Sequence, residues 1–268
     1  MNFRVDVIVV GDSKSGHNIL DKLALHKPAL NIAFISQSFK STTTHDYANV
    51  KYFKDEVTYV SYRHRLFCCY MKNGDNVFST HLVVASGLNY EPLIVNNEQV
   101  PCVFNTLNDV PKSAKDQPAL VVCNHESDAK FALEVAKKYK QVYICTKELN
   151  LAESVSATTA KKLDKIENIA VLPNASLQKV ISDNGVLQKA KLDNYLEINC
   201  SAIYAKTQSH PAIEFMPRKI LQKEEEYPVV TENCESTLVP KCFVAGNCLK
   251  KYTKAMEQKL VEALLKDF

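Results

Sequence analysis

The sequence predicts an α/β protein of two three-layer domains, in each of which a parallel β-sheet is joined to an antiparallel β-meander. An apolar strand, a glycine-containing loop and a helix open the chain, and the same order of elements begins again at residue 119. Each of these β-α-β units is followed by three short strands, two of them joined by an Asn-Gly hairpin. The 268 residues are enough for two modest domains.

The composition excludes several classes of function. The chain is 46% hydrophobic and 24% charged, as is usual for a globular protein, and its net charge of +3 is too small to indicate a nucleic-acid or membrane partner. No stretch approaches the ~20 apolar residues of a membrane span, and the N-terminus lacks a signal-peptide pattern. We therefore expect a cytoplasmic protein.

The cysteines indicate reduced thiols rather than a disulfide framework. There are nine of them, an odd number, and several lie inside apolar runs such as LVVCN and VYICT. No C-x-x-C pair is present, and no cluster of metal-ligand residues stands out. The sequence therefore predicts neither a dithiol redox motif nor a metal site.

The first β-α-β unit starts with the apolar strand 5–10 and the loop GDSKSG at 11–16. Apolar residues then recur at helical spacing over 17–25, and a second strand follows at 31–35. The loop resembles the G-x-G-x-x-G turn that holds a pyrophosphate at a helix N-terminus, with Ser13 at the middle glycine position. The unit is therefore predicted to be Rossmann-like.

A meander follows the first unit, and the second unit repeats the plan. Short strands are predicted at 56–62, 65–72 and 77–84, the last ending at the turn Ala85-Ser86-Gly87. A strand and helix at the end of the chain return to complete the first domain. The later predicted elements are strand 119–123, loop 124–127, helix 128–139, strand 141–145, helix 153–165, meander strands 176–182, 185–192 and 195–204, a strand within the passage 229–231 and 239–247, and helix 252–266.

Four passages resemble the thioredoxin reductase-like flavoproteins of the pyridine nucleotide-disulfide oxidoreductase family, which carry two dinucleotide-binding domains. They are VDVIVVGDSKSG, the turn 85–87, the segment 103–110, and TLVPKCFVAGN at 237–247. The resemblance implies a discontinuous FAD-binding-like domain, 1–100 with 222–268, and an inserted NAD(P)-binding-like domain, 101–221. It also implies a set of candidate cofactor residues: Gly11, Asp12, Ser13, Lys14, Ser15, Gly16, Ser36, Ser86, Gly87, Gly246 and Asn247.

The first domain departs from the family pattern at three of these candidates. Ser13 replaces the glycine nearest the pyrophosphate, and its hydroxyl could donate to a phosphate or cap the helix. Ser36 stands where an acidic residue would hold the adenosine ribose, and Asn247 replaces an aspartate. The segment between Ser36 and the meander is also shorter than in the family.

The second nucleotide loop contains no glycine at all. It reads Cys123-Asn124-His125-Glu126-Ser127-Asp128, with two acidic residues at a helix N-terminus. NAD(P)H binding in the family's manner is therefore not expected. The six glycines of the chain are all needed for the first loop, the two hairpins and the two turns: Gly11, Gly16, Gly74, Gly87, Gly185 and Gly246.

The redox centre of thioredoxin reductases is missing, since Cys102 matches at most the first cysteine of their C-x-x-C. We therefore predict a degenerate relative without catalytic residues and without a tightly bound cofactor, which acts as a binding or scaffold protein for an unidentified protein partner, as a homodimer. Two alternatives stay open. One is an oxidoreductase that binds FAD and takes electrons from a partner protein, and the other is an adenine-nucleotide sensor.

Overall fold

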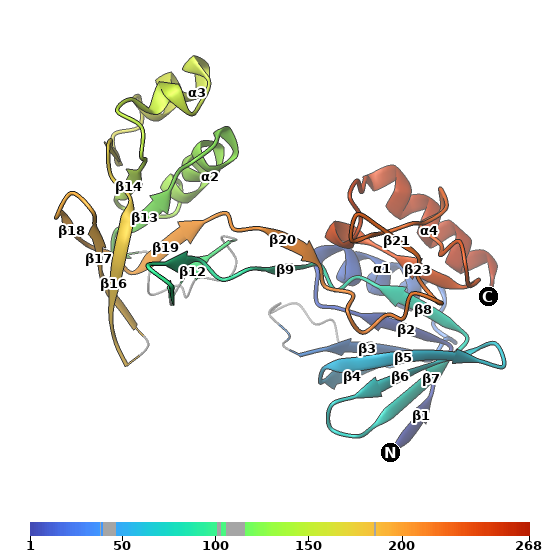
Figure 1. The fold of residues 1–268 in the computed structure, drawn as a ribbon. Coiled ribbons are helices and arrows are strands. Elements are labelled where there is room, and N and C mark those ends of the chain that lie inside the picture. Colours follow the sequence, from blue (N-terminus) through green and yellow to red (C-terminus); the bar gives the residue numbers. More distant parts are fainter. Residues whose placement is uncertain (38, 40–46, 101–102, 106–115, 185) are drawn as a thin grey trace. The chain divides into compact units, whose positions relative to one another are not determined.

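The computed structural model describes all residues except 38, 40–46, 101–102, 106–115 and 185 (Figure 1). The chain forms two compact units, unit 1 (Met1–Asn89 with Ser209–Phe268) and unit 2 (Tyr90–Gln208). The sequence placed the boundaries at 100/101 and 221/222, so the observed unit 2 begins and ends earlier than the predicted inserted domain. The predicted sites at Cys102 and Gly185, and most of the passage 103–110, lie outside the described residues.

A five-stranded parallel sheet forms the middle layer of unit 1. Its inner strands are continuous apolar runs because both faces of the sheet are covered. The chain fills one side of the sheet first and then the other, so the strand order reverses between β2 and β8. In spatial order the strands are β23 (Cys242–Val244), β8 (His81–Val84), β2 (Val7–Val10), β3 (Ile32–Ser36) and β4 (Val50–Lys54).

Two helices and a meander cover this sheet. The helices lie together on one face, and the meander lies on the other (Figure 1). One hydrophobic core joins all three layers. The helices are α1 (Lys14–His26) and α4 (Lys254–Lys266), and the meander consists of β5 (Val57–Arg63), β6 (Leu66–Met71) and β7 (Asn76–Ser79), with β1 (Asn2–Arg4) parallel to β7.

Unit 2 repeats this architecture. A parallel sheet has the spatial order β15 (Ile169–Leu172), β14 (Val142–Cys145), β13 (Ala119–Val122), β19 (Ala202–Ala205) and β12 (Val103–Phe104). The fifth strand comes from the start of the unit, whereas β23 of unit 1 comes from the end of the chain. The meander is β16 (Leu177–Asp183), β17 (Val186–Leu192) and β18 (Glu197–Asn199), and the helices are α2 (Glu126–Ala136) and α3 (Ala157–Leu163), the latter after a 3-10 turn at Leu151–Glu153.

The predicted fold of two Rossmann-like units is thus confirmed, but two predicted strands are each divided. Residues 77–84 form β7 and β8, which are interrupted at Thr80, and residues 195–204 form β18 and β19. In both units this break lets the chain leave the meander and enter the parallel sheet. Strand β4 was not predicted. The strand expected within 229–247 is β23, and Val230 makes an isolated bridge with Ser236.

The other described elements are short. β9 (Leu88–Tyr90) pairs with β20 (Ser209–Pro211), β10 (Ile94–Val95) with β11 (Glu98–Gln99), and β21 (Lys223–Glu224) with β22 (Tyr227–Pro228). A 3-10 turn at Gly246–Cys248 follows β23.

Two glycines allow three backbone segments of unit 1 to meet. Gly11 has a φ of +111°, and a Cβ there would lie 2.4 Å from the carbonyl oxygen of Ala85. A Cβ on Gly16 would lie 2.4 Å from the carbonyl oxygen of Gly11. The loop after β2 therefore packs directly on the end of β8 and on the first turn of α1.

We predict that Gly16→Ala lowers the free energy of unfolding by about 2–3 kcal/mol, because the added methyl group must displace backbone rather than a flexible side chain. Urea unfolding of the variant and wild type measures this loss. Lys14→Ala, at an exposed position of the same helix, is the control and should change stability by less than about 0.5 kcal/mol. A Gly16→Ala protein as stable as wild type would contradict the packing argument.

Candidate functional site

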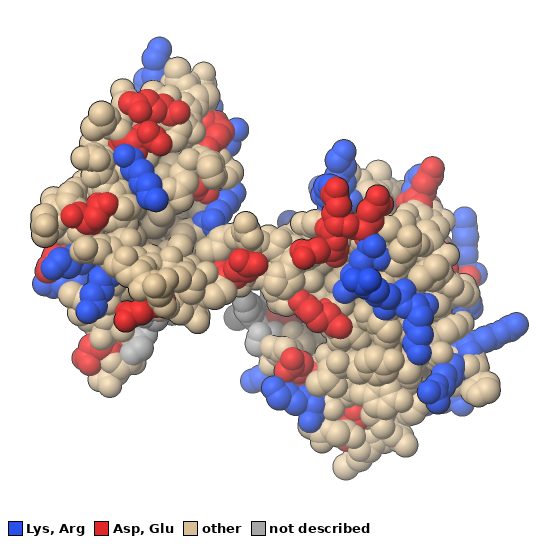
Figure 2. Space-filling view, viewed as in Figure 1, with Lys and Arg blue, Asp and Glu red and all other residues tan. Residues whose placement is uncertain are grey.

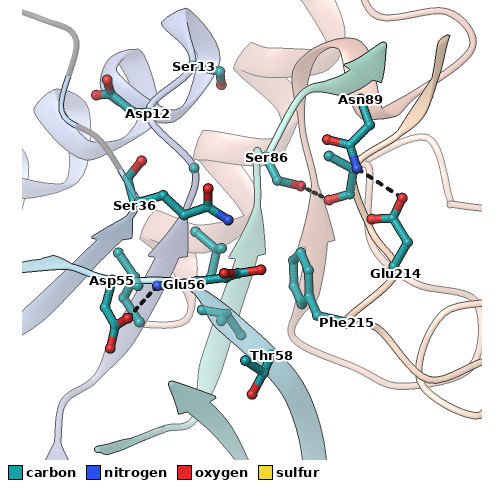
Figure 3. A pocket seen from close by; sticks show the side chains of 16 residues that line it. Asp12, Ser13, Ser36, Asp55, Glu56, Thr58, Ser86, Asn89, Glu214 and Phe215 are labelled. Carbon is teal, nitrogen blue, oxygen red and sulfur yellow. Dashed lines mark hydrogen bonds between the residues drawn. The ribbon is translucent and has the colours of Figure 1, made fainter. Parts of the chain in front are cut away.

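A cleft of about 620 Å³ opens in unit 1 where β2, β3 and β4 reach their carboxyl ends (Figure 3). Open parallel sheets bind ligands at this edge, beside the point where the strand order reverses. Five of the predicted candidates reach it. The cleft is lined by Val10, Gly11, Asp12, Ser13, Ile35, Ser36, Gln37, Asp55, Glu56, Val57, Thr58, Ser86, Asn89, Ala212, Glu214 and Phe215.

The loop after β2 presents the start of α1 to this cleft. Ser13 is the N-cap, and its hydroxyl oxygen accepts a hydrogen bond from the backbone N–H of Gly16 at 3.1 Å. Of the two roles left open for the Ser13 hydroxyl, helix capping is the one observed. The first turn of α1 contains no acidic residue, and Lys14 begins the helix, so the positive end of the helix dipole is not neutralised within the turn.

Asp12, in the loop before α1, has a partner within that helix. Its carboxylate pairs with Nε2 of His17, and the side chain of Asp12 is only 6% exposed. The ring of His17 packs on Phe34 of β3, with ring centroids 5.1 Å apart. The acidic residue of the loop is therefore tied back to α1 and the sheet.

The other predicted candidates follow β8 and β23 and lie close to the loop after β2. Ser86 lines the cleft and donates from its hydroxyl to the carbonyl oxygen of Ala212 (Figure 3). The N–H of Gly87 donates to Sγ of Cys248 at 3.1 Å. A Cβ on Gly246 would lie 3.0 Å from Oγ of Ser15, so that turn packs on α1. Asn247 is exposed and is not among the residues that line the cleft.

The opposite wall of the cleft was not predicted from the sequence. It contains Asp55 and Glu56, which follow β4, and the segment with Glu214 and Phe215, which follows β20. Nδ2 of Asn89 donates to Oε1 of Glu214 at 3.0 Å (Figure 3). Asp55 and Glu56 reach the cleft because β4 pairs with β3, and Glu214 and Phe215 reach it because the chain returns to unit 1. No local sequence pattern marks either pair.

In unit 2 the corresponding helix start carries its own anion. Oδ2 of Asp128 accepts hydrogen bonds from the backbone N–H groups of Asn124 and His125, both at 3.0 Å. The carboxylate of Glu126 accepts from the backbone N–H of Ser156 at 2.7 Å and from the hydroxyl of Thr159 at 2.6 Å. It therefore links the N-terminus of α2 to that of α3. These bonds, led by that from Thr159, lower the pKa of Glu126 to about 2.

The cysteines that the structure describes are all free and buried. Burial raises the pKa of the thiol to about 11 in Cys123 and Cys234, and to about 12 in Cys145, Cys200 and Cys242. A thiol with such a pKa is protonated at neutral pH and is a poor nucleophile. These thiols serve as packing groups.

The described residues contain no group of three or more His, Cys, Asp or Glu side chains arranged to hold a metal ion. Within the same part of the chain, no helix has the length and apolar character needed to cross a membrane. On the face seen in Figure 2, acidic and basic side chains are interspersed over each unit, in agreement with the small net charge of +3.

Comparisons with known proteins agree with this architecture. The sequence model of a family described as pyridine nucleotide-disulphide oxidoreductase matches residues 23–246. Two similar solved structures are thioredoxin reductases from T. acidophilum (15% identity, TM-score 0.70) and Lactococcus lactis (14%, 0.68), with 98% of each chain covered. A third is a bacillithiol disulfide reductase from Bacillus cereus (16%, 0.61), with 99% of this chain and 100% of that chain covered. A search of the curated proteins gave no match.

These findings correct one prediction. From the sequence we expected no tightly bound cofactor, with FAD only as an alternative and no NAD(P)H. The prediction of no tightly bound cofactor is wrong, because the family match and the thioredoxin reductase fold make FAD the cofactor to expect. The physical reason lies at Ser13, whose hydroxyl turns back onto the N–H of Gly16, while the cleft in front of the loop stays open. The Ser13 side chain therefore obstructs the approach of a pyrophosphate to the loop less than we expected from the sequence.

We predict that Ser13→Ala lowers the free energy of unfolding by about 1 kcal/mol, because the N–H of Gly16 loses its acceptor. Ser13→Gly should cost only a few tenths of a kcal/mol, since glycine is itself tolerated at this capping position. Chemical denaturation of both variants separates the two values. Equal stability of Ser13→Ala and wild type would mean that the cap contributes nothing.

We also predict a pH-dependent contribution from Glu126. Its folded pKa of about 2 lies below the ordinary value of 4.5, so the folded chain favours the carboxylate. The stabilisation is fully present above about pH 4.5 and is lost as the pH falls towards about 2. The melting temperatures of wild type and Glu126→Gln should therefore converge as the pH is lowered.

A matched control for this measurement lies on the same helix. Glu134→Gln removes an ion pair between two exposed side chains, Glu134 and Lys137, and should change the melting temperature less than Glu126→Gln does at neutral pH. A difference between wild type and Glu126→Gln that stays constant from about pH 6 to about pH 3 would refute the assigned role.

Proposed function

Because the chain belongs to the pyridine nucleotide-disulphide oxidoreductase family, we propose that it is a flavoprotein that binds FAD in the cleft of unit 1 and transfers electrons without an internal disulfide. One observation carries the proposal. The cleft lies where the strand order reverses, in front of a helix N-terminus that has no acidic residue in its first turn. Such a helix N-terminus offers the positive end of its dipole and free backbone N–H groups to a pyrophosphate.

The residues of the cleft fit the cofactor. The backbone at Gly11 and Ser13, with Lys14 beside it, would hold the pyrophosphate, and the carboxylate of Asp12 is already paired with Nε2 of His17. Val57 and Phe215 supply apolar surface on the far wall. FAD, when bound, supplies one- and two-electron transfer, and the protein's part is to hold it, orient it and shield it from water.

The thiol chemistry of the thioredoxin reductases is not part of the proposal. The sequence contains no C-x-x-C pair, and the described cysteines are buried as protonated thiols. A reaction with an external substrate therefore replaces the exchange with an internal disulfide.

The missing C-x-x-C pair also favours a second candidate, a non-catalytic binding or scaffold protein that keeps the cofactor as part of its fold. The two candidates differ in one property. The flavin of an oxidoreductase is reduced by NADH, NADPH or a protein donor and is reoxidised by an acceptor, whereas the flavin of a scaffold protein stays oxidised with all of them. The assignment of unit 2 as the NAD(P)-binding-like unit, the homodimer and the cytoplasmic location stay predictions.

We predict that protein soaked in excess FAD and desalted keeps about one FAD per chain, and that anaerobic reduction then consumes about two electrons per FAD. An internal disulfide would add about two more electrons. Absorbance spectra before and after desalting and a dithionite titration measure both quantities. Protein that keeps no flavin would exclude both candidates. An uptake near four electrons would show that the protein contains an internal disulfide.

Lys14→Glu provides the variant for this test. It reverses the charge at the start of α1, and FAD should bind about five- to tenfold more weakly. Lys138→Glu makes the same change of net charge at an exposed position in unit 2 and should leave the affinity unchanged. Equal loss in both variants would assign the effect to overall charge rather than to the cleft.

A further inference from the structure

The end of β3 lacks a group that dinucleotide-binding folds normally place there. An acidic residue after the second strand usually accepts hydrogen bonds from the hydroxyls of the adenosine ribose. Here the strand ends at Ser36, and Gln37 follows. Neither side chain carries a charge, so a ribose at this edge would lack a charged acceptor from β3.

The neighbouring strand supplies carboxylates at the same edge. β4 pairs with β3 in parallel, and Ser36 lies opposite Lys54, the last residue of β4. The next two residues, Asp55 and Glu56, therefore emerge beside the end of β3. Together with Ser36 and Gln37 they line the cleft.

Asp55 is already engaged in shaping the turn. Its Oδ1 accepts from the backbone N–H of Glu56 at 2.8 Å, and its Oδ2 accepts from the backbone N–H of Asn73 at 3.2 Å. Figure 3 shows this carboxylate turned away from the middle of the cleft. Asp55 therefore fixes the backbone from which Glu56 projects.

Glu56 extends towards the middle of the cleft (Figure 3). Its backbone carbonyl accepts from the N–H of Lys72 at 2.9 Å, and its Oε2 accepts from Nζ of Lys72 at 3.0 Å. Lys72 is the hydrogen-bond partner of this carboxylate among the described residues, which leaves Oε1 able to accept. The side chain is 40% exposed, so the charge remains hydrated without a ligand.

We infer that Glu56 is the acceptor for the ribose hydroxyls of an adenine nucleotide, in place of the acid missing after β3. The inference rests on the proposed FAD site and names the contact that selects its adenosine half. An ionised carboxylate accepts strongly from two vicinal hydroxyls, and it repels a phosphate on the same ribose. The cleft therefore selects nucleotides whose adenosine ribose carries unsubstituted 2′- and 3′-hydroxyls, such as ADP or FAD.

The test measures calorimetric binding of ADP and 2′,3′-dideoxy-ADP to the full chain. Wild type should bind ADP about tenfold more tightly than the dideoxy analogue. Glu56→Ala should bind ADP about tenfold more weakly than wild type and should bind the two nucleotides about equally. Two controls keep the carboxylate of Glu56. Lys72→Ala removes its partner, and Glu232→Gln breaks the exposed pair of Glu232 with Lys259, which lies outside the cleft.

Each outcome bears on a stated claim. Preference for ADP that survives in Glu56→Ala, or that is absent from wild type, overturns the role of Glu56 and leaves the FAD site intact. Preference that is lost equally in Lys72→Ala assigns the effect to the ion pair and also overturns it. Wild type that binds neither FAD nor ADP overturns the proposed function and this inference with it. Melting temperatures of all variants confirm that each one is folded.

Discussion

The close approach of three backbone segments at Gly11 is the constraint on which unit 1 depends. A Cβ at Gly11 or at Gly16 would lie 2.4 Å from a carbonyl oxygen of the neighbouring segment. The contact holds the first turn of α1 against the ends of β2 and β8, and the backbone N–H of Gly11 continues the ladder to the carbonyl oxygen of Ile35 at 2.9 Å. The N-terminus of α1 is thereby fixed at the sheet edge, which is where the cleft opens.

The sequence predicted the parts of the fold that follow from local pattern. The duplicated order of strand, helix, strand and meander was readable because buried parallel strands are continuous apolar runs. The division of residues 77–84 at Thr80 was not predicted, although the polar run Ser79-Thr80-His81 separates the apolar residues of the two strands. Strand β4 was missed because it lies at a sheet edge and, of its five residues, buries only Phe53.

The dependence on local pattern also explains which parts of the cleft could be predicted from the sequence. The loop from Gly11 to Gly16 resembles a known nucleotide-binding motif, so the sequence identified the wall of the cleft that this loop forms. Glu56 lies on the other wall only because β4 pairs with β3, and Phe215 only because the chain returns to unit 1 after unit 2. Neither position carries a local signal, so pairing between distant segments had to be known first. The role of Ser13 was predictable as one of two alternatives, and geometry selected capping.

The two helix starts differ in the groups that cap them. α1 is capped by a neutral hydroxyl and begins with a lysine, so its dipole attracts an anion from the cleft. α2 is capped by the carboxylate of Asp128, so a ligand of unit 2 meets N–H groups that already have a partner. Since β4, β3, β2 and β8 of unit 1 follow the same order as β15, β14, β13 and β19 of unit 2, the difference arises from side chains at the helix start rather than from the arrangement of these strands. A few side chains after the first strand of each unit therefore decide whether the N-terminus of the helix is open to an anion.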